Sequence, residues 1–360
     1  MITGNKGEWS EFYAFLKILS DGKLFAADKN LQKIPEKYFD VLQIVREEAK
    51  TGKKMYDLTK RSRDIFIFDE NNKIIKVVNK ASISSKVEKI FERIKASTDR
   101  TFSISLANKA MEELHCTQIK AASGKKADLF LKIYDSISPT TPDLGFSIKS
   151  MLGSPSTLLN SSGSTNFVYK LSKNVNALKI NSIIGSSKIR DRILEIEGGD
   201  AVIEYDHMDN EGFKKNLRMI DTMFPQMIAL TLKTFFEGHG ATLSEILDYL
   251  GKKQLVQKKF QLSLNDYTYK IKLFLMAVAL GMTPRGEWSG RTEAHGGYII
   301  VREDGEVVCY HLYNRDQFEE YLFENTKLET PSSSRHKFGV VYEENGEQFI
   351  KLNLQIRFLK

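Results

Sequence analysis

The stretch SGKKADLFLKIYDSISPTTPDLGFSIK, residues 123–149, decides the fold because it has the pattern of a β-hairpin. Leu129, Leu131 and Ile133 are separated by single intervening residues, which is the two-residue period of a half-buried strand. The same alternation returns over residues 145–149, and residues 136–142 between the two runs have turn-forming composition. The stretch therefore predicts two antiparallel strands joined by a turn.

The predicted hairpin places an acid and a lysine on one face. If the strands pair about the middle of the turn, Asp128 falls opposite Lys149, with Cβ atoms about 5 Å apart. The written sequence Pro142-Asp143 followed by Ser147-x-Lys149 also resembles the proline–aspartate and acid-x-lysine signature of many nucleases. However, six extended residues of about 3.3 Å each separate Asp143 from Lys149 by roughly 20 Å. Asp128 is therefore the predicted partner of Lys149.

A carboxylate beside a lysine suits hydrolysis of a phosphodiester with a hard cation. Asp128 would bind Mg²⁺ through oxygen, leaving positions for water and a phosphate oxygen, while Lys149 orients or helps deprotonate the attacking water. Many such sites have a second carboxylate two residues before the lysine, where this chain has Ser147. We expect the metal site to use the backbone carbonyl of Ile148 or the side chain of Glu11 instead. The structural alternative is an ordinary surface ion pair.

Composition sets the broad class of the protein. The 360 residues are 41% hydrophobic and 28% charged, which is ordinary for a soluble globular protein. Lys and Arg number 53 against 46 Asp and Glu, and the net charge of +7 fits a polyanionic partner. Only Cys116 and Cys309 occur, which excludes a disulfide framework and fits a reducing cytoplasm. The polar N-terminus and the lack of an apolar run near the ~20 residues of a membrane span predict a cytosolic protein.

The remaining periodicities predict a mixed α+β (α/β) fold, with helices dominating early and strands late. Helices are expected over residues 7–20, 35–50, 83–95, 106–115, 216–236 and 270–280, with Pro225 kinking or restarting one of them. Strands are expected over residues 65–78 as a hairpin, 297–301, 307–312, 338–342 and 349–358. A soft boundary near Gly251 gives a catalytic region, 1–251, and a β-rich region, 252–360, that contributes to DNA recognition.

Two polar loops are candidate DNA contacts. The first follows Lys149 and is dense in short hydrogen-bonding side chains, which suit phosphates and base edges; the residues singled out are Ser156, Thr157, Asn160, Ser164, Thr165 and Asn166. The second is Thr330–Lys337, where the residues singled out are Ser334, Arg335, His336 and Lys337. Arg335 could read a guanine bidentately while Lys337 contacts a phosphate. In both cases the alternative is an exposed loop that touches nothing.

Longer stretches of the chain resemble the HpaII-type family of type II restriction endonucleases, within the PD-(D/E)xK nuclease group. The most distinctive match is LGFSIKSMLGSPSTLLNSSGSTNFVYK from Leu144. Further matches span nearly the whole chain: KGEWSEFYAFLKILSDGKL from Lys6, KKADLFLKIYD from Lys125, NLRMID from Asn216, LGMTP from Leu280, GGYIIVREDGEV from Gly296, LETPSSSRHKFG from Leu328 and LNLQIRF from Leu352.

The resemblance implies a Mg²⁺-dependent homodimer of the bacterial cytoplasm that cuts double-stranded DNA at a short specific site, paired with a protective DNA methyltransferase. It implies a PD-(D/E)xK core with a central mixed sheet flanked by helices. Asp128 would be a metal ligand, Lys149 the water-orienting residue, and Ser147 the occupant of the usual acidic position. Glu11 or Glu8 would complete the site. The alternatives are a non-cleaving DNA-binding protein with a nuclease fold and a repair or structure-specific nuclease.

Overall fold

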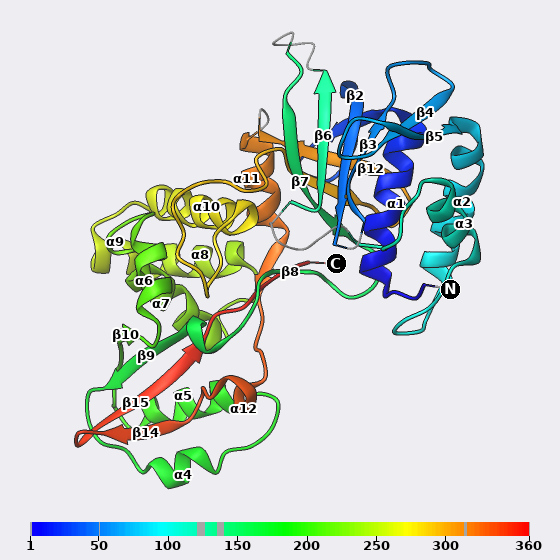
Figure 1. The fold of residues 1–360 in the computed structure, drawn as a ribbon. Helices are drawn as coiled ribbons and strands as arrows, with labels where there is room; N and C mark the ends of the chain where they lie inside the picture. Colours follow the sequence, from blue (N-terminus) through cyan, green and yellow to red (C-terminus); the bar gives the residue numbers. More distant parts are fainter. Residues whose placement is uncertain (1, 50, 121–126, 135–139, 313–314, 360) are drawn as a thin grey trace. The chain divides into compact units, whose positions relative to one another are not determined.

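The first part of the fold is a nine-stranded mixed sheet that contains the predicted hairpin (Figure 1). The structure is a computed structural model that describes residues 2–49, 51–120, 127–134, 140–312 and 315–359. In spatial order the strands are β1 (Lys23–Ala27), β12 (Val307–His311), β11 (Gly297–Val301), β7 (Asp143–Ser150), β6 (Leu129–Tyr134), β2 (Lys33–Glu48), β3 (Gly52–Asp57), β4 (Asp64–Phe68) and β5 (Ile74–Asn79). Because β1 pairs with both β12 and β2, the strands β1-β12-β11-β7-β6-β2 form a closed ring of pairings.

The chain divides into two compact units, 1–156 with 292–321 and 157–291 with 322–359. This division differs from the expected single boundary, since Gly251 lies inside helix α8 (Leu243–Lys252) of the second unit. The reason is a long-range pairing: β11 runs parallel to β7, with Ile299 beside Ile148, and draws the later hairpin into the first sheet. Local sequence patterns carry no sign of such a pairing.

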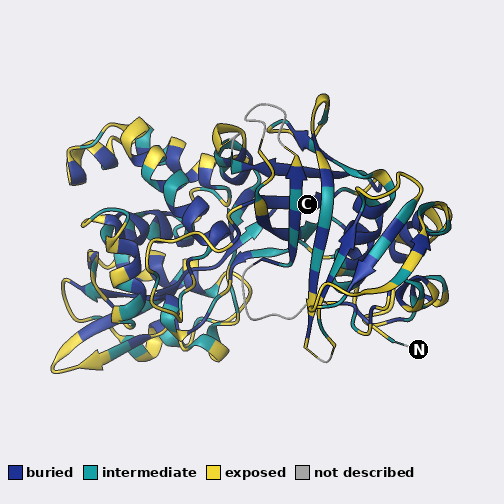
Figure 2. Cartoon of the chain, turned by 45° about the horizontal axis from the view of Figure 1, so that its top comes forward, coloured by how far each residue is buried: buried dark blue, intermediate teal, exposed yellow. Residues whose placement is uncertain are grey.

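Helix α1 (Lys6–Asp21) packs against the first sheet, as its apolar spacing predicts. It begins with a capping box between Asn5 and Glu8 and ends at Gly22, which adopts the left-handed conformation. Its buried face includes Trp9, Phe12, Phe15, Leu16 and Leu19, each contributing about 1.5–3 kcal/mol by burial. Helices α2 (Lys80–Ala96) and α3 (Ser105–Glu113) confirm two further predictions. Figure 2 shows the buried residues concentrated along strands and inner helix faces.

The predicted helix over residues 35–50 is wrong, because this segment is the long strand β2. A β-bulge between Val41 and Gln43 shifts the pairing of β2 with β6. The buried side chains Val41 and Ile44 are consequently three residues apart, a spacing that imitates a helix. The expectation that strands come late is also wrong, since β1 to β5 all lie before residue 80.

The hairpin of β6 and β7 is confirmed, but its predicted register is wrong by two residues. Leu129 pairs with Phe146 and Lys132 with Asp143, so Asp128 lies beside Ser147 and not opposite Lys149. Moving the centre of a turn by one residue changes every cross-strand partner by two and keeps the same face. The alternation therefore fixed the face but not the register. Residues 135–139 of the predicted turn lie outside the described residues.

The second unit contains two smaller sheets. One has the order β10 (Ile203–Met208), β9 (Asn166–Leu171), β15 (Glu347–Asn353), β14 (Val341–Glu344), and the other β13 (Thr326–Leu328), β16 (Ile356–Phe358), β8 (Thr157–Leu159). Its helices are η1 (Gly163–Thr165), α4 (Ala177–Asn181), α5 (Lys188–Gly198), α6 (Glu211–Arg218), α7 (Phe224–Phe236), α8, α9 (Leu255–Phe260), α10 (Leu264–Leu280) and α12 (Ser333–His336). The last change from the first unit to the second along the chain falls between Tyr321 and Leu322, inside helix α11 (Arg315–Glu324). Pro225 restarts the chain as α7, as predicted. Among the described residues, no helix is long and apolar enough to cross a lipid bilayer.

Candidate active site

Asp128 is fixed to strand β7 by three hydrogen bonds. Its backbone N–H donates to the carbonyl of Phe146 (2.8 Å), while its Oδ2 accepts from the N–H of Ile148 (2.7 Å) and the hydroxyl of Ser147 (3.0 Å). Within the described residues, Oδ1 has no hydrogen-bond donor. Ser147 therefore supports the carboxylate by holding one oxygen, and the other oxygen is available to a ligand.

Helix α1 presents Glu11 to the same place. The Oε1 atom of Glu11 lies 3.4 Å from Nζ of Lys120. Burial and the nearby charge of Asp128 raise the pKa of Glu11 to about 7, against the opposing effect of Lys120. Glu8 has another role, because its Oε2 accepts from the backbone N–H of Asn5 (2.9 Å) in the capping box. Between the two acids considered, the structure thus brings Glu11 to the site.

Lys149 completes the group from β7, two residues beyond Ser147 and on the same face. Its side chain is half-buried, and its Nζ lies 5.5 Å from the ring centroid of Tyr298. Burial lowers the pKa of Lys149, while the charges of Asp128 and Glu11 oppose that change. An ammonium that is poorly hydrated and faces two carboxylates is suited to orient a water molecule and to exchange a proton with it.

A hydroxyl pair joins the two elements that carry these side chains. Ser150 on β7 donates to the Oγ of Ser10 on α1 at 2.9 Å, and Ser10 is fully buried. The contact lies one residue from both Glu11 and Lys149. This hydrogen bond holds helix α1 against strand β7 next to the candidate site residues that the two elements carry.

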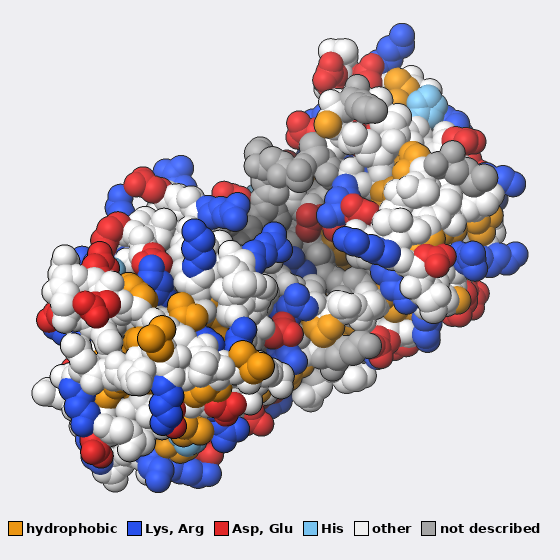
Figure 3. Space-filling model, turned by 90° about the horizontal axis from the view of Figure 1, so that it is seen from below, with side chains coloured by type: hydrophobic (Ala, Val, Ile, Leu, Met, Phe, Trp, Pro, Cys, Tyr) orange, Lys and Arg blue, Asp and Glu red, His pale blue; other side chains and the backbone are white. Residues whose placement is uncertain are grey.

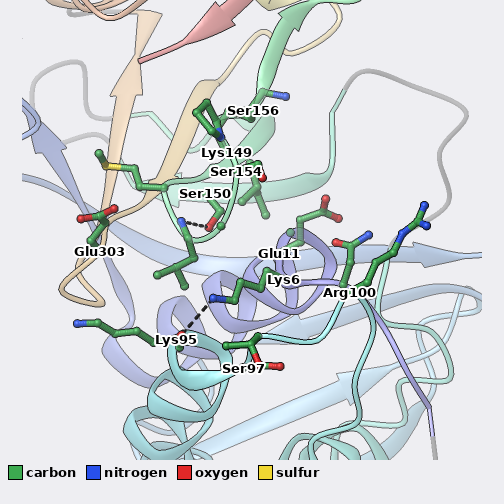
Figure 4. Close-up of a pocket in the computed structure, with 18 of the residues that line it drawn as sticks. Lys6, Glu11, Lys95, Ser97, Arg100, Lys149, Ser150, Ser154, Ser156 and Glu303 are labelled. Atoms are coloured by element: carbon green, nitrogen blue, oxygen red, sulfur yellow. Dashed lines mark hydrogen bonds between the residues drawn. The ribbon is translucent and has the colours of Figure 1, made fainter. Parts of the chain in front are cut away.

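A cleft of about 1030 Å³ opens in front of the site. Glu11 and Lys149 line it from α1 and β7, and Ile148 contributes to its wall (Figure 4). The cationic side chains in the lining are Lys6, Lys95, Arg100 and Lys149, and the hydroxyls are those of Ser97, Thr98, Ser150, Ser154 and Ser156. Cations and short hydroxyls are the side chains that contact a nucleic-acid backbone.

The donors present fit a magnesium ion that retains water. Among the described residues no donor reaches Oδ1 of Asp128, and a cation bound near Glu11 would offset both the burial and the Asp128 charge that raise the pKa of Glu11. Within the described residues, no group of three or more His, Cys, Asp or Glu side chains is arranged to hold a metal. Two carboxylates suffice for Mg²⁺, which usually keeps several waters and accepts substrate phosphates as ligands.

The predicted DNA contacts of the first polar loop fall into two groups. Ser156, Thr157 and Ser164 are half-buried and Asn160 is exposed, so these side chains can reach a ligand. Thr165 and Asn166 are instead buried, at 0% and 3% exposed. Thr165 accepts from the N–H of Ser162 (3.0 Å), and Asn166 donates to Asp209 (3.2 Å) and to the carbonyl of His336 (3.1 Å). Their polar atoms therefore stabilise the loop, and a contact of these two side chains with DNA stays a prediction.

The second predicted loop forms the short helix α12. Arg335, Lys337 and Ser334 are exposed, whereas His336 is half-buried and its Nε2 lies 3.1 Å from the hydroxyl of Ser161. Together with the bond from Asn166 to His336, this contact ties the two polar loops to each other within the second unit. Arg335 and Lys337 thus project from an anchored element.

Sequence reasoning missed Lys120, Ser10 and Tyr298. Lys120 follows α3 in a segment without helical or strand period, and Ser10 occupies the buried side of an apolar helix. Tyr298 reaches Lys149 only through the parallel pairing of β11 with β7. For Ser10 the sequence offered one signal. This serine lies next to Glu11 in the N-terminal stretch that resembles the family.

The raised pKa of Glu11 gives a stability prediction with a defined sign. The folded protein holds the proton up to about pH 7, while an unfolded chain releases it near 4.5, so the metal-free fold loses stability as pH rises between these values. Glu11→Gln should stabilise the metal-free protein by about 1–3 kcal/mol at pH 8, given roughly 1.4 kcal/mol per pKa unit. Urea unfolding in EDTA at pH 5 and pH 8 tests this. A gain of equal size at both pH values would contradict the assignment.

Comparison with known proteins gives concordant results along the whole chain. The sequence profile described as "HpaII restriction endonuclease" matches residues 5–358. The protein named "Type II restriction enzyme HpaII" from Haemophilus parainfluenzae is 39% identical over 358 residues, which cover 99% of each chain. No solved structure matches this chain.

Proposed function

This chain belongs to the HpaII restriction endonuclease family, and we propose that Asp128, Glu11 and Lys149 form the site at which it hydrolyses DNA. Family membership makes the protein a type II restriction enzyme, that is, a site-specific deoxyribonuclease. The observation that supports the location is that Glu11 and Lys149 line one cleft while the charge of Asp128 acts on both of them.

In the proposed mechanism, Asp128 and Glu11 would hold Mg²⁺, and the carbonyl of Ile148 is a third candidate ligand. Bound Mg²⁺ supplies charge stabilisation at the phosphate and lowers the pKa of a bound water. Lys149 orients the attacking water and accepts or shares its proton. Ser147 and the N–H of Ile148 keep Asp128 in place throughout. The water oxygen bonds to phosphorus as the bond to the leaving oxygen breaks. The proton of the attacking water goes to Lys149 in its neutral form, and the leaving oxygen takes a proton from solvent water.

The arrangement supports placing the site in the PD-(D/E)xK group. An acid at the start of β6 and a lysine near the end of β7 lie in a central mixed sheet, and a helix that carries a further acid packs on them. The chain departs from the group's pattern at Ser147, where a carboxylate is usual. The Ser147 hydroxyl donates a hydrogen bond to Asp128. One cation per site is the number that this donor set supports.

Digestion of plasmid DNA by the purified protein tests the proposed function. We expect discrete fragments in Mg²⁺, whose sizes and ends identify the recognised site. Retarded DNA in a gel without cleavage in Mg²⁺ or Mn²⁺ would instead indicate a non-cleaving DNA-binding protein. Cleavage restricted to branched or damaged DNA would indicate a repair or structure-specific nuclease.

We also propose that the enzyme acts as a homodimer in the bacterial cytoplasm, alongside a DNA methyltransferase that protects the host site. Each chain offers one candidate site, and cutting two antiparallel strands symmetrically calls for two copies related by a twofold axis. Lys and Arg side chains occur throughout the face seen in Figure 3, in keeping with the net charge of +7 and a DNA partner.

Arg335 is the proposed base-reading residue of the second unit. Arg335→Ala should weaken binding to the cognate site by about 10- to 100-fold, because a bidentate contact to guanine contributes roughly 1–3 kcal/mol. Binding to unrelated DNA should change little. Competition gel shifts in Ca²⁺ measure both affinities, with Lys252→Ala on α8 as a control, since Lys252 is already paired with Asp248 (2.6 Å). Equal weakening on all sequences would make Arg335 a phosphate contact.

A further inference from the structure

A cluster of three charged side chains is buried in the first sheet and has no part in the chemistry above. Arg46 is 3% exposed, Glu48 1% and Lys54 6%. Arg46 Nε lies 3.2 Å from Glu48 Oε1, and Lys54 Nζ lies 3.3 Å from Glu48 Oε2. Removing charges from water is costly even when they are paired, so such a cluster is a poor device for stability alone. The hydrogen bonds of the cluster show which part of the chain it fixes in place.

The register of β2 and β3 places the cluster under helix α1. Arg46 pairs with Lys54, one step along the same face from the pair of Ile44 with Tyr56. The guanidinium of Arg46 lies 5.7 Å from the ring centroid of Phe12 and 5.4 Å from that of Phe15, both on α1. The face that α1 covers therefore changes from apolar to charged toward one end of the strands.

The cluster holds the chain segment 117–119 through its backbone. Arg46 Nη2 donates to the carbonyls of Gln118 (2.6 Å) and Ile119 (2.5 Å). Glu48 Oε2 accepts from the backbone N–H of Thr117 (2.9 Å) and from its hydroxyl (2.7 Å). These are charge-assisted bonds made in a buried place, so they fix the path of this segment closely. The next residue in the chain is Lys120.

Lys120 lies at the edge of the candidate active site, next to Glu11. Its Nζ lies 3.4 Å from Glu11 Oε1, and 49% of its side chain is exposed. One side of the ammonium thus faces a proposed metal ligand, and part of the side chain remains exposed. A second lysine at this distance from Glu11 is placed to contact a phosphate oxygen next to the reacting one.

We propose that Lys120 is a second phosphate-binding lysine of the active site, and that the buried cluster of Arg46, Glu48 and Lys54 positions it. The inference rests on the proposed function, because it needs the phosphate to lie at Glu11 and Lys149. With Glu11 engaged by Mg²⁺, the Lys120 ammonium takes a phosphate oxygen as its partner. Arg46 is then a positioning residue that never touches DNA.

Lys120→Met tests the phosphate contact. Its single-turnover cleavage rate in saturating Mg²⁺ should fall about 10- to 100-fold, while affinity for cognate DNA in Ca²⁺ falls less than about fivefold. Lys120→Arg should recover most of the rate because it keeps the charge. Lys17→Met is the matched control, since Lys17 is also on the surface of the first unit and paired with an acid, Asp21 at 3.0 Å, away from Glu11. A wild-type rate for Lys120→Met would overturn the proposal.

Arg46→Met tests the positioning role, together with the double variant Arg46→Met/Lys120→Met. If Arg46 acts through Lys120, the double variant cleaves no more slowly than the slower single variant. Amide exchange at 117–120 should accelerate in Arg46→Met. Multiplicative losses in the double variant would overturn the positioning role. If Arg46→Met does not fold, Glu48→Gln keeps the shape, loosens the hold on Thr117 and should give the same selective loss of rate.

The comparison with Asp128→Asn separates this inference from the proposed function. An inactive Asp128→Asn beside a fully active Lys120→Met overturns the inference and leaves the active site in place. An active Asp128→Asn overturns the active-site assignment itself, whatever Lys120→Met does.

Discussion

Asp128→Asn is expected to lower Mg²⁺-dependent cleavage by about 10³-fold or more, because it removes the carboxylate oxygen that is open to a cation. The amide oxygen of the new side chain can still accept from the N–H of Ile148, so the fold should be kept. Single-turnover cleavage in Mg²⁺ measures the loss, and gel shifts in Ca²⁺ should show near-normal binding to cognate DNA.

Asp143→Asn is the matched control for this variant. Asp143 is exposed at the opposite end of β7 and pairs across the hairpin with Lys132. It should retain most of the activity. An inactive Asp143→Asn enzyme beside an active Asp128→Asn enzyme would restore the literal proline–aspartate motif as the catalytic signature.

Lys149→Met is expected to lower cleavage by about 10²- to 10⁴-fold, the range typical of removing a positioned acid or base. Its apolar stem can occupy the same half-buried place beside Tyr298, so the effect should fall on the rate and not on folding. Rapid-quench cleavage gives the rate, and thermal unfolding gives the stability.

Lys132→Met serves as the control for the lysine, since Lys132 lies on β6 of the same hairpin, at the level of Asp143. A Lys149→Met enzyme that binds DNA poorly but cleaves bound DNA at the normal rate would contradict the assignment. Lys149 would then be a binding residue.

The sequence predicted the helix and the hairpin that carry the candidate site because both are encoded locally. Asp128 and Lys149 belong to one hairpin whose alternation fixes their common face, and Glu11 belongs to a helix with a clear apolar stripe. The register of the hairpin was not predictable, because a two-residue shift leaves the alternation unchanged. The resemblance to a family added Glu8 as an alternative to Glu11, and the structure separates them because Glu8 is engaged in the capping box while Glu11 lines the cleft.

Other features depend on contacts between distant segments. The parallel pairing of β7 with β11 and the closure of β1 onto β12 leave no local pattern. The bulge in β2 produced a misleading helical spacing. The polar loop after Lys149 looked uniform in composition, yet Thr165 and Asn166 are buried in hydrogen bonds while Asn160 is exposed. Composition cannot distinguish a hydroxyl that supports a loop from one that reaches a ligand.

If Asp128 and Glu11 share one cation, both should contribute to the binding of Mn²⁺, which can stand in for Mg²⁺. Electron paramagnetic resonance measures bound Mn²⁺ for the wild type in the presence of uncut cognate DNA with a non-cleavable phosphate. We expect Asp128→Asn and Glu11→Gln each to weaken this binding at least tenfold, while Asp143→Asn leaves it unchanged. Unaltered Mn²⁺ binding in both Asp128→Asn and Glu11→Gln would contradict it.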